Sequence, residues 1–157
     1  IILNKQIKNS EKKIKIEKIA LKVVDVDGLS RFSLGSHRKN LSEKQLKEYT
    51  RVFRLFFAKN ISSRLQNYSD QNIKVVGSKK INENYVMVKS KMTSKIDMQE
   101  IKIDWRVFKI KEKLVIRDLV IEGLSLAKTQ REEFNSIFLS KGFEGLMASL
   151  NDFISKN

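Results

Sequence analysis

The spacing of apolar residues changes twice along this chain, and those changes limit the fold more than any other feature. Up to Asn67, apolar residues recur about every 3.6 residues, which is typical of helices that bury one side. After Asn67 they recur at every second residue, as they do in strands, until the helical spacing returns at Leu124. The order of helices, then strands, then helices indicates an α+β domain.

Three helical segments are expected before the spacing changes. The first lies among lysines, and its apolar stripe consists of Ile16, Ile19, Ala20 and Val23. Asp27 is expected to cap a short second helix over residues 28–34, which ends at Gly35. Ser42 and Gln45 have the spacing of a capping box and open the longest helix. The stripe of that helix comprises Leu46, Tyr49, Phe53, Phe56, Phe57, Ile61, Leu65 and Tyr68.

Four strands are expected between residues 73 and 121, with turns at residues 82–84 and 111–113. Turns this short leave no room for crossover helices, so the strands should form an antiparallel meander. We therefore expect a curved four-stranded sheet, covered on one face by the N- and C-terminal helices. Gly142 should break the last helical segment. No linker or repeat divides the chain, so residues 1–157 should form a single domain.

Composition narrows the possible partners. The formal net charge is +14, which favours an anionic partner such as nucleic acid, an anionic membrane surface or an acidic protein. Lysines are spread along the whole chain, as they would also be in a protein from an AT-rich genome. The charge is therefore either functional or an ordinary solvated surface.

Groups for catalysis are scarce. The chain has no cysteine and a single histidine, His37, so neither a thiolate nor a cluster of histidines can bind a metal. Asp104 and Asp118 lie on expected strands, where they either face a cavity, as acids do in some small cone-shaped enzymes, or point outward toward lysines. Trp105 shares its side of a strand with aliphatic residues, which does not favour a platform for stacking nucleic-acid bases. We predict a protein that is not an enzyme, has no cofactor and does not bind nucleic acid.

Several motifs in the last third of the chain occur in a specific order. The segments 103–107 (IDWRV) and 114–126 (LVIRDLVIEGLSL) resemble those of the MlaC, or toluene-tolerance auxiliary, family of periplasmic phospholipid-binding proteins. Arg131 and Phe134 match the R-x-x-F motif of that family, and Gly142 with Leu146 matches its closing motif; the segment 24–27 (VDVD) and the Ser42 capping box also match. The resemblance covers roughly residues 20–155. This chain departs from the family at Leu114, Trp105 and Gln130, where the family has tryptophan, tyrosine and tyrosine.

The resemblance implies a carrier of diacyl glycerophospholipid, which is cargo and not a cofactor. Its partners would be an MCE-domain ring with an ABC transporter at the inner membrane, a lipoprotein–porin complex at the outer membrane and, briefly, a membrane surface. The periplasm would be its location. The chain begins at Ile1 without methionine, so we expect that an upstream segment, which could include a secretory signal, has been removed.

The inward side of the sheet and the aromatic stripes of two helices are the candidate lining of a lipid cavity. A solid core would show the same apolar pattern, so a basic module that binds nucleic acid or another partner is the alternative. The candidate lining residues are Phe53, Phe57, Val86, Val88, Ile101, Ile103, Trp105, Val107, Phe134 and Phe138.

Overall fold

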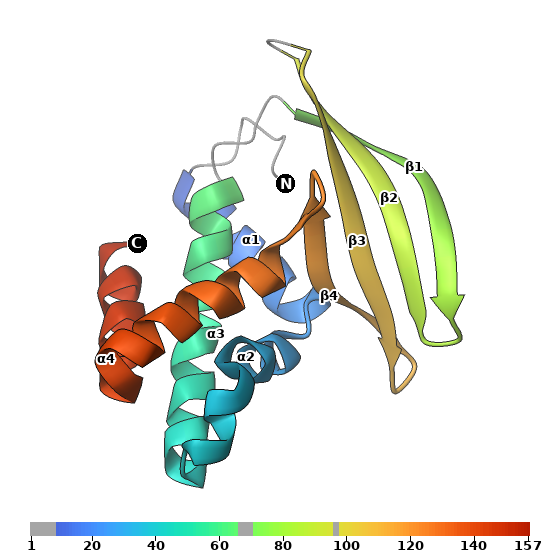
Figure 1. Ribbon diagram of the computed structural model, residues 1–157. Coiled ribbons are helices and arrows are strands. Elements are labelled where there is room, and N and C mark those ends of the chain that lie inside the picture. Colours follow the sequence, from blue (N-terminus) through green and yellow to red (C-terminus); the bar gives the residue numbers. More distant parts are fainter. Residues whose placement is uncertain (1–8, 66–70, 96–97) are drawn as a thin grey trace.

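The computed structural model describes residues 9–65, 71–95 and 98–157, which form a group of helices beside one sheet (Figure 1). The helices are α1 (Asn9–Val23), α2 (Val26–Leu34), the 3-10 helix η1 (Gly35–Asn40), α3 (Glu43–Leu65) and α4 (Leu126–Lys156). The strands are β1 (Gln71–Asn82), β2 (Tyr85–Ser94), β3 (Glu100–Ile110), β4 (Lys113–Ile121) and β5 (Leu124–Ser125).

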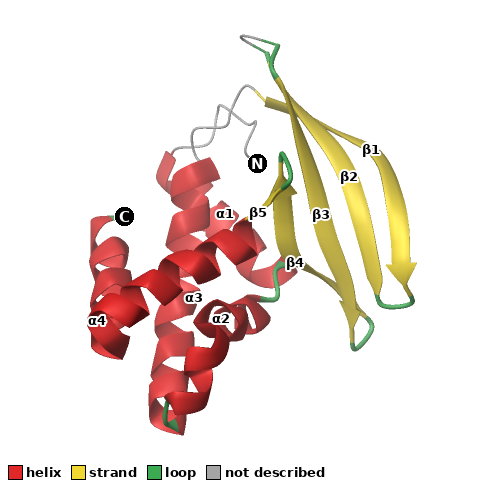
Figure 2. Ribbon diagram, in the orientation of Figure 1, coloured by secondary structure: helices red, strands yellow, loops and turns green. Residues whose placement is uncertain are grey.

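The sheet is an antiparallel meander in which neighbours along the chain are neighbours in space (Figure 2). This confirms the α+β class, but the predicted number of four strands was wrong. The fifth strand, β5, has two residues and pairs Ser125 with Val120 and Leu124 with Ile121. Two residues are too few to produce an alternating pattern, so the sequence around Leu124 indicated only the following helix.

The helices contact the sheet chiefly through β4, while β1, β2 and β3 extend away from them (Figure 1). At the junction of α1 and α2 the chain runs beside β4, where Val24 bridges to Ile116. The N–H of Asp25 donates to the carbonyl oxygen of Ile116 at 2.9 Å. With β5 on the other part of the same edge, β4 is hydrogen-bonded on both sides and joins the two halves of the fold.

The N-terminus of α2 is capped by Asp25, two residues before the predicted cap Asp27. The Asp25 carboxylate accepts a hydrogen bond from the N–H of Gly28 at 3.0 Å. Asp27 lies inside the first turn and accepts two hydrogen bonds from Arg54 of α3, at 2.8 and 2.7 Å. Both aspartates suit a helix start, and each also binds a distant arginine: Arg117 of β4 donates to Asp25 at 2.9 Å, and Arg54 donates to Asp27.

The predicted capping box of α3, the end of α2 at Gly35 and the break at Gly142 are confirmed, whereas the last helix begins at Leu126 and not at Leu124. The N–H of Ser42 donates to Oε1 of Gln45 at 2.9 Å, and the N–H of Gln45 donates back to Oγ of Ser42 at 3.2 Å, which makes a reciprocal capping box. Gly35 ends α2 with a φ of 54°. Gly142 interrupts α4 with a φ of 67° and a ψ of −170°.

The main cluster of buried residues is built by α2, α3 and α4. Eight of its ten buried members belong to α3 and α4, and the other two belong to α2. The Tyr49 hydroxyl lies 2.7 Å from Oγ of Ser33, and burial raises the pKa of Tyr49 far above its usual range. Of the predicted stripes, Ile19 is exposed and Tyr68 lies outside the described residues. The buried members of the cluster are Val26, Leu34, Tyr49, Val52, Phe53, Phe56, Phe134, Leu146, Met147 and Leu150.

The ion pair between Asp27 and Arg54 should make a small, pH-dependent contribution to stability. Hydrogen bonds from Arg54 lower the pKa of Asp27, so the pair stabilises the fold above the unfolded-state pKa of about 4 and loses its effect as the pH falls through the lower folded-state value. Because both side chains are about half exposed, Asp27→Asn should reduce the free energy of unfolding at neutral pH by less than about 1 kcal/mol. Urea unfolding across an acidic pH series should show the two proteins converging; a difference that does not change with pH would contradict this.

Candidate functional site

One side of the sheet is almost entirely apolar. The strand register places the side chains of Val86, Val88, Ser90 and Met92 directly opposite those of Val107, Trp105, Ile103 and Ile101, so all of them share one side. We call this side the apolar face. It continues onto β4 through Ile116, Leu119 and Ile121, and onto β1 through Ile73 and Val75 and, beyond the irregularity at Val76, through the exposed Ser78 and Lys80.

Ser90 is the polar residue at the centre of the apolar face, and its hydroxyl is fully used. Trp105 donates its Nε1–H to Oγ of Ser90 at 2.8 Å, and Ser90 donates to the carbonyl oxygen of Ile103 at 3.0 Å. The Ser90 residue is 1% exposed to solvent. This chain of bonds satisfies the indole and the hydroxyl together, so the centre of the face, around Ser90 and Trp105, offers mainly hydrocarbon to a neighbour.

Burial falls off from the middle of the apolar face toward β1. Ser90, Met92 and Ile103 are buried, and Val86, Val88, Ile101, Trp105 and Val107 are partly buried. On β1, Ile73 is 50% exposed and Val75 is 63% exposed. An apolar surface that stays this open costs free energy in water, which is usual for surfaces that bind something.

The predicted lining residues fall into two separate groups. The six on strands all lie on the apolar face, as the alternation predicted. Phe53 and Phe134 are 3% and 4% exposed within the helical cluster, where their rings meet edge to face at 6.2 Å, and Phe57 packs against the same cluster. Within the described residues the buried members of this cluster all come from helices. That any of these residues contacts a ligand stays a prediction.

Phe138, the last of the predicted lining residues, is partly buried at the side of α4. His37 of η1 stacks on its ring at 4.1 Å between centroids, and Nε2 of His37 lies 2.7 Å from Oδ1 of Asn135. His37, the single histidine of the chain, therefore holds η1 against α4.

The side of the sheet opposite the apolar face carries most of the charged residues of the strands. Asp104 lies there, directly opposite Lys89. Asp118 lies on the same side and is 8% exposed; it accepts hydrogen bonds from the Ser125 hydroxyl at 2.5 Å and from the Ala127 N–H at 3.0 Å. Asp118 therefore ties β4 to the start of α4. Neither aspartate lies on the apolar face. An acid that acted on a ligand bound there would have to lie on that side of the sheet.

Replacing Asp118 should destabilise the fold without affecting a reaction. Asp118→Ala removes the acceptor for Ser125 and Ala127 and the carboxylate 3.7 Å from Arg106. We expect the free energy of unfolding in urea to fall by about 1–3 kcal/mol. Asp104→Ala, on the same side of the sheet, is the matched control and should change it by less than about 0.5 kcal/mol. Equal effects would mean that the contacts of Asp118 do not stabilise the start of α4.

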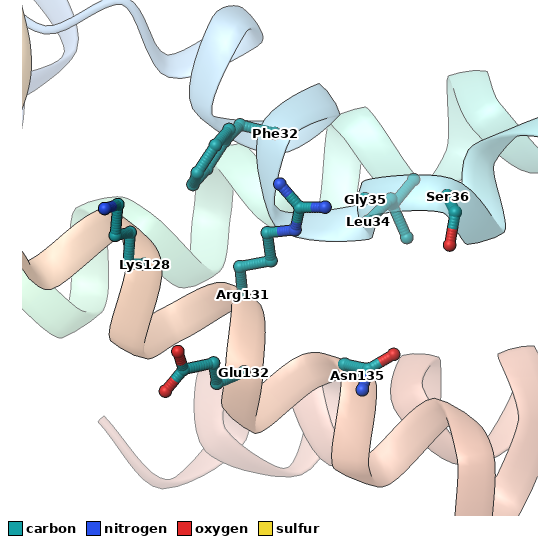
Figure 3. A pocket seen from close by; sticks show the side chains of 8 residues that line it. All are labelled: Phe32, Leu34, Gly35, Ser36, Lys128, Arg131, Glu132 and Asn135. Carbon is teal, nitrogen blue, oxygen red and sulfur yellow. The ribbon is translucent and has the colours of Figure 1, made fainter.

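Two open pockets lie outside the apolar face. One, of about 420 Å³, lies between the end of α2 and the first turns of α4 (Figure 3). Arg131 points into it, with its guanidinium carbon 5.1 Å from the centroid of the Phe32 ring. The other, of about 450 Å³, lies between the α1–α2 junction and the turn that joins β3 to β4. Both openings mix charged and apolar residues, so neither resembles a closed apolar cavity.

The described part of the chain holds no group of histidine and acidic residues that could bind a metal ion. Within the same residues, no helix combines the length and the hydropathy needed to cross a membrane.

An open apolar sheet face beside a separately packed group of helices defines a class of α+β proteins with a surface for hydrophobic ligands. The family model described as "MlaC protein" matches residues 2–152, so this chain belongs to the MlaC family. Membership confirms the resemblance read from the motifs, and it places the chain among lipid-binding carriers and not among enzymes.

A solved structure has the same fold. The phospholipid-binding protein from Ralstonia solanacearum, determined in complex with a phospholipid, superposes with a TM-score of 0.77 at 16% sequence identity. The match covers 95% of this chain and 83% of that one. No curated protein matches the sequence.

The candidate set from the sequence missed several residues of the apolar face. Met92, Leu119 and Ile121 follow the same two-residue alternation as the predicted members, and that signal would have found them. The bond between Trp105 and Ser90 has no signal in the sequence, since it depends on the register between two strands.

Proposed function

We propose that this protein is a periplasmic carrier that binds the acyl chains of a phospholipid against the apolar face. The observation that carries the proposal is that the helices bury their own aromatic residues, while the apolar face stays partly open with the polar groups at its centre satisfied. Family membership and the fold shared with the phospholipid-binding protein from Ralstonia solanacearum support the same ligand.

The size of the hydrophobic effect explains why such a carrier is needed. Burying one methylene gains about 0.8 kcal/mol, so a tail of about sixteen carbons gains about 12 kcal/mol when it leaves water. A lipid crossing water between membranes therefore needs a protein surface that shields its tails. A bilayer shields them equally well, so transfer to the carrier is close to neutral and its direction comes from the partners at each end.

The partners that suit this role are those that the family resemblance implies. Lipid would be exchanged with an MCE-domain ring and its ABC transporter at the inner membrane, and with a lipoprotein–porin complex at the outer membrane. The carrier contributes binding and no chemistry, which agrees with the structural roles of Asp118 and His37.

Native mass spectrometry of the protein purified without detergent tests the proposal. The expected result is a folded protein with the added mass of diacyl phospholipid, which solvent extraction then identifies. A folded protein that neither retains lipid nor takes it up from donor vesicles would overturn the proposal. Affinity for nucleic acid that falls steeply with salt would instead support the alternative of a basic nucleic-acid-binding module.

A further inference from the structure

Strand β1 is the free edge of the sheet and is unusually open. It pairs with β2 on one side, and every residue after Gln71 is exposed (Figure 1). Its exposed apolar residues are Ile73, Val75, Val76 and Ile81. An edge strand of this length with exposed apolar side chains is a liability unless it has a binding partner.

The charge of β1 has one sign. The strand carries Lys74, Lys79 and Lys80, and its sequence, QNIKVVGSKKIN, has no acidic residue. On the side of the sheet away from the apolar face, Lys74 lies directly opposite Lys91, and Lys91 lies directly opposite Lys102. We call Lys74, Lys91 and Lys102 the basic row.

The basic row is unfavourable for the fold on its own, because like charges directly opposite each other on neighbouring strands repel. Lys91 is compensated by Glu100, whose Oε1 lies 2.8 Å from its Nζ. Within the described ranges, the ammonium groups of Lys74 and Lys102 have no carboxylate in ion-pair distance. A row that costs stability and leaves exposed cations is suited to an anionic partner.

We propose that β1 and the basic row form the surface through which this protein docks on an anionic phospholipid membrane. The inference rests on the proposed function, because the complexes that would exchange the cargo lie in bilayers, and a carrier that reaches them comes close to the lipid surface. Lysine ammonium groups on flexible stems bind head-group phosphates as point charges, and exposed apolar side chains beside them enter the interface.

The register also explains what docking by this edge would achieve. Ile73 and Val75 lie on the apolar face, directly opposite Met92 and Ser90. Docking through β1 therefore places the open end of the apolar face against the membrane, while Lys74, the residue between these two, reaches the phosphates from the other side of the same strand. An acyl chain could then pass from the bilayer onto the face without crossing water.

Two other interpretations of the lysines fit less well. The lysines and the irregular pairing near Val76 and Ile81 could serve only to keep the β1 edge from pairing with a strand of another chain. That role does not explain Lys102, which lies on β3, two strands away from the edge. Lysines alone would also suit an acidic protein partner, but the exposed side chains of Ile73 and Val75 beside them favour a bilayer interface, which offers both anionic head groups and hydrocarbon.

Flotation with vesicles tests the docking surface. Wild-type protein should bind vesicles of equimolar phosphatidylcholine and phosphatidylglycerol, and this binding should weaken as salt is added. It should bind vesicles of phosphatidylcholine alone far less. The variant Lys74→Gln/Lys79→Gln/Lys80→Gln should lower partitioning onto the anionic vesicles by about 100-fold. Lys18→Gln/Lys44→Gln/Lys47→Gln is the matched control, because it removes the same charge from exposed helical positions and should change partitioning by less than about threefold.

The outcomes separate the two proposals. If both triple variants bind equally, or if wild type does not prefer anionic vesicles, the docking surface is overturned, whatever lipid the protein holds. Binding of an acidic protein with no binding to vesicles would do the same. Native mass spectrometry of the β1 variant should still show lipid after loading in detergent, because Lys74 and Lys79 lie on the other side of the sheet and Lys80, opposite Val86, lies at the exposed end of β1 beside Glu83. Absence of lipid from wild type as well would count against the carrier and not against the surface.

Discussion

Val88→Lys should yield a folded protein that has lost its phospholipid. Val88 lies at the middle of β2 on the apolar face, directly opposite Trp105, and a lysine there puts a charge where acyl chains would lie. Moving that charge into contact with hydrocarbon costs well over the 1.4 kcal/mol that corresponds to a factor of ten, so the lipid bound per folded protein should fall by at least about tenfold. Extraction and native mass spectrometry measure the fall.

Met87→Lys is the matched control for this variant. Met87 is the preceding residue of the same strand, is also partly buried, and lies on the opposite side of the sheet, where it faces Arg106. The chemical change and the charge added are the same, so Met87→Lys should keep its lipid. If both variants lose lipid equally, or neither does, the cargo does not lie on the apolar face.

Phe53→Ala should cause the largest loss of stability and leave lipid binding unchanged. The Phe53 ring is 3% exposed and lies within 6.4 Å of the rings of Phe57 and Phe134. Removing it leaves a cavity in the helical cluster, which should lower the free energy of unfolding by about 3–5 kcal/mol in urea or guanidinium.

A milder variant keeps this prediction testable if Phe53→Ala does not fold. Phe53→Leu should cost less than the alanine variant and remain folded at low temperature, where its lipid content can be compared with that of wild type. Lipid content equal to wild type would make Phe53 part of the scaffold. A fall in lipid content in this folded variant would instead place Phe53 in the cavity lining, as the sequence predicted.

The elements of the fold could be predicted because their signals are local. The stripe of α3, the capping box at Ser42 and Gln45, and the break at Gly142 each depend on residues a few positions apart. The alternation on β2 and β3 likewise predicted correctly which side chains share a side of the sheet.

What depends on distant contacts could not be predicted in the same way. Asp25 and Asp27 look alike as caps in the sequence, and their distant partners differ: Arg117 of β4 binds Asp25, and Arg54 of α3 binds Asp27. The stripe containing Phe53 shows that one side of a helix is buried, but not whether a sheet, another helix or a ligand covers it. The structure places Phe134 of α4 there, a residue 81 positions further along the chain.

The separation of the helical cluster from the apolar face has a consequence for how proteins of this kind diverge. Mutations at sites without shared contacts have nearly additive effects. If the apolar face holds the cargo as proposed, residues of the sheet can change to suit a longer, shorter or unsaturated chain without loosening Phe53, Phe134 and their neighbours. Selection for cargo and selection for thermal endurance would then act on different residues of one architecture.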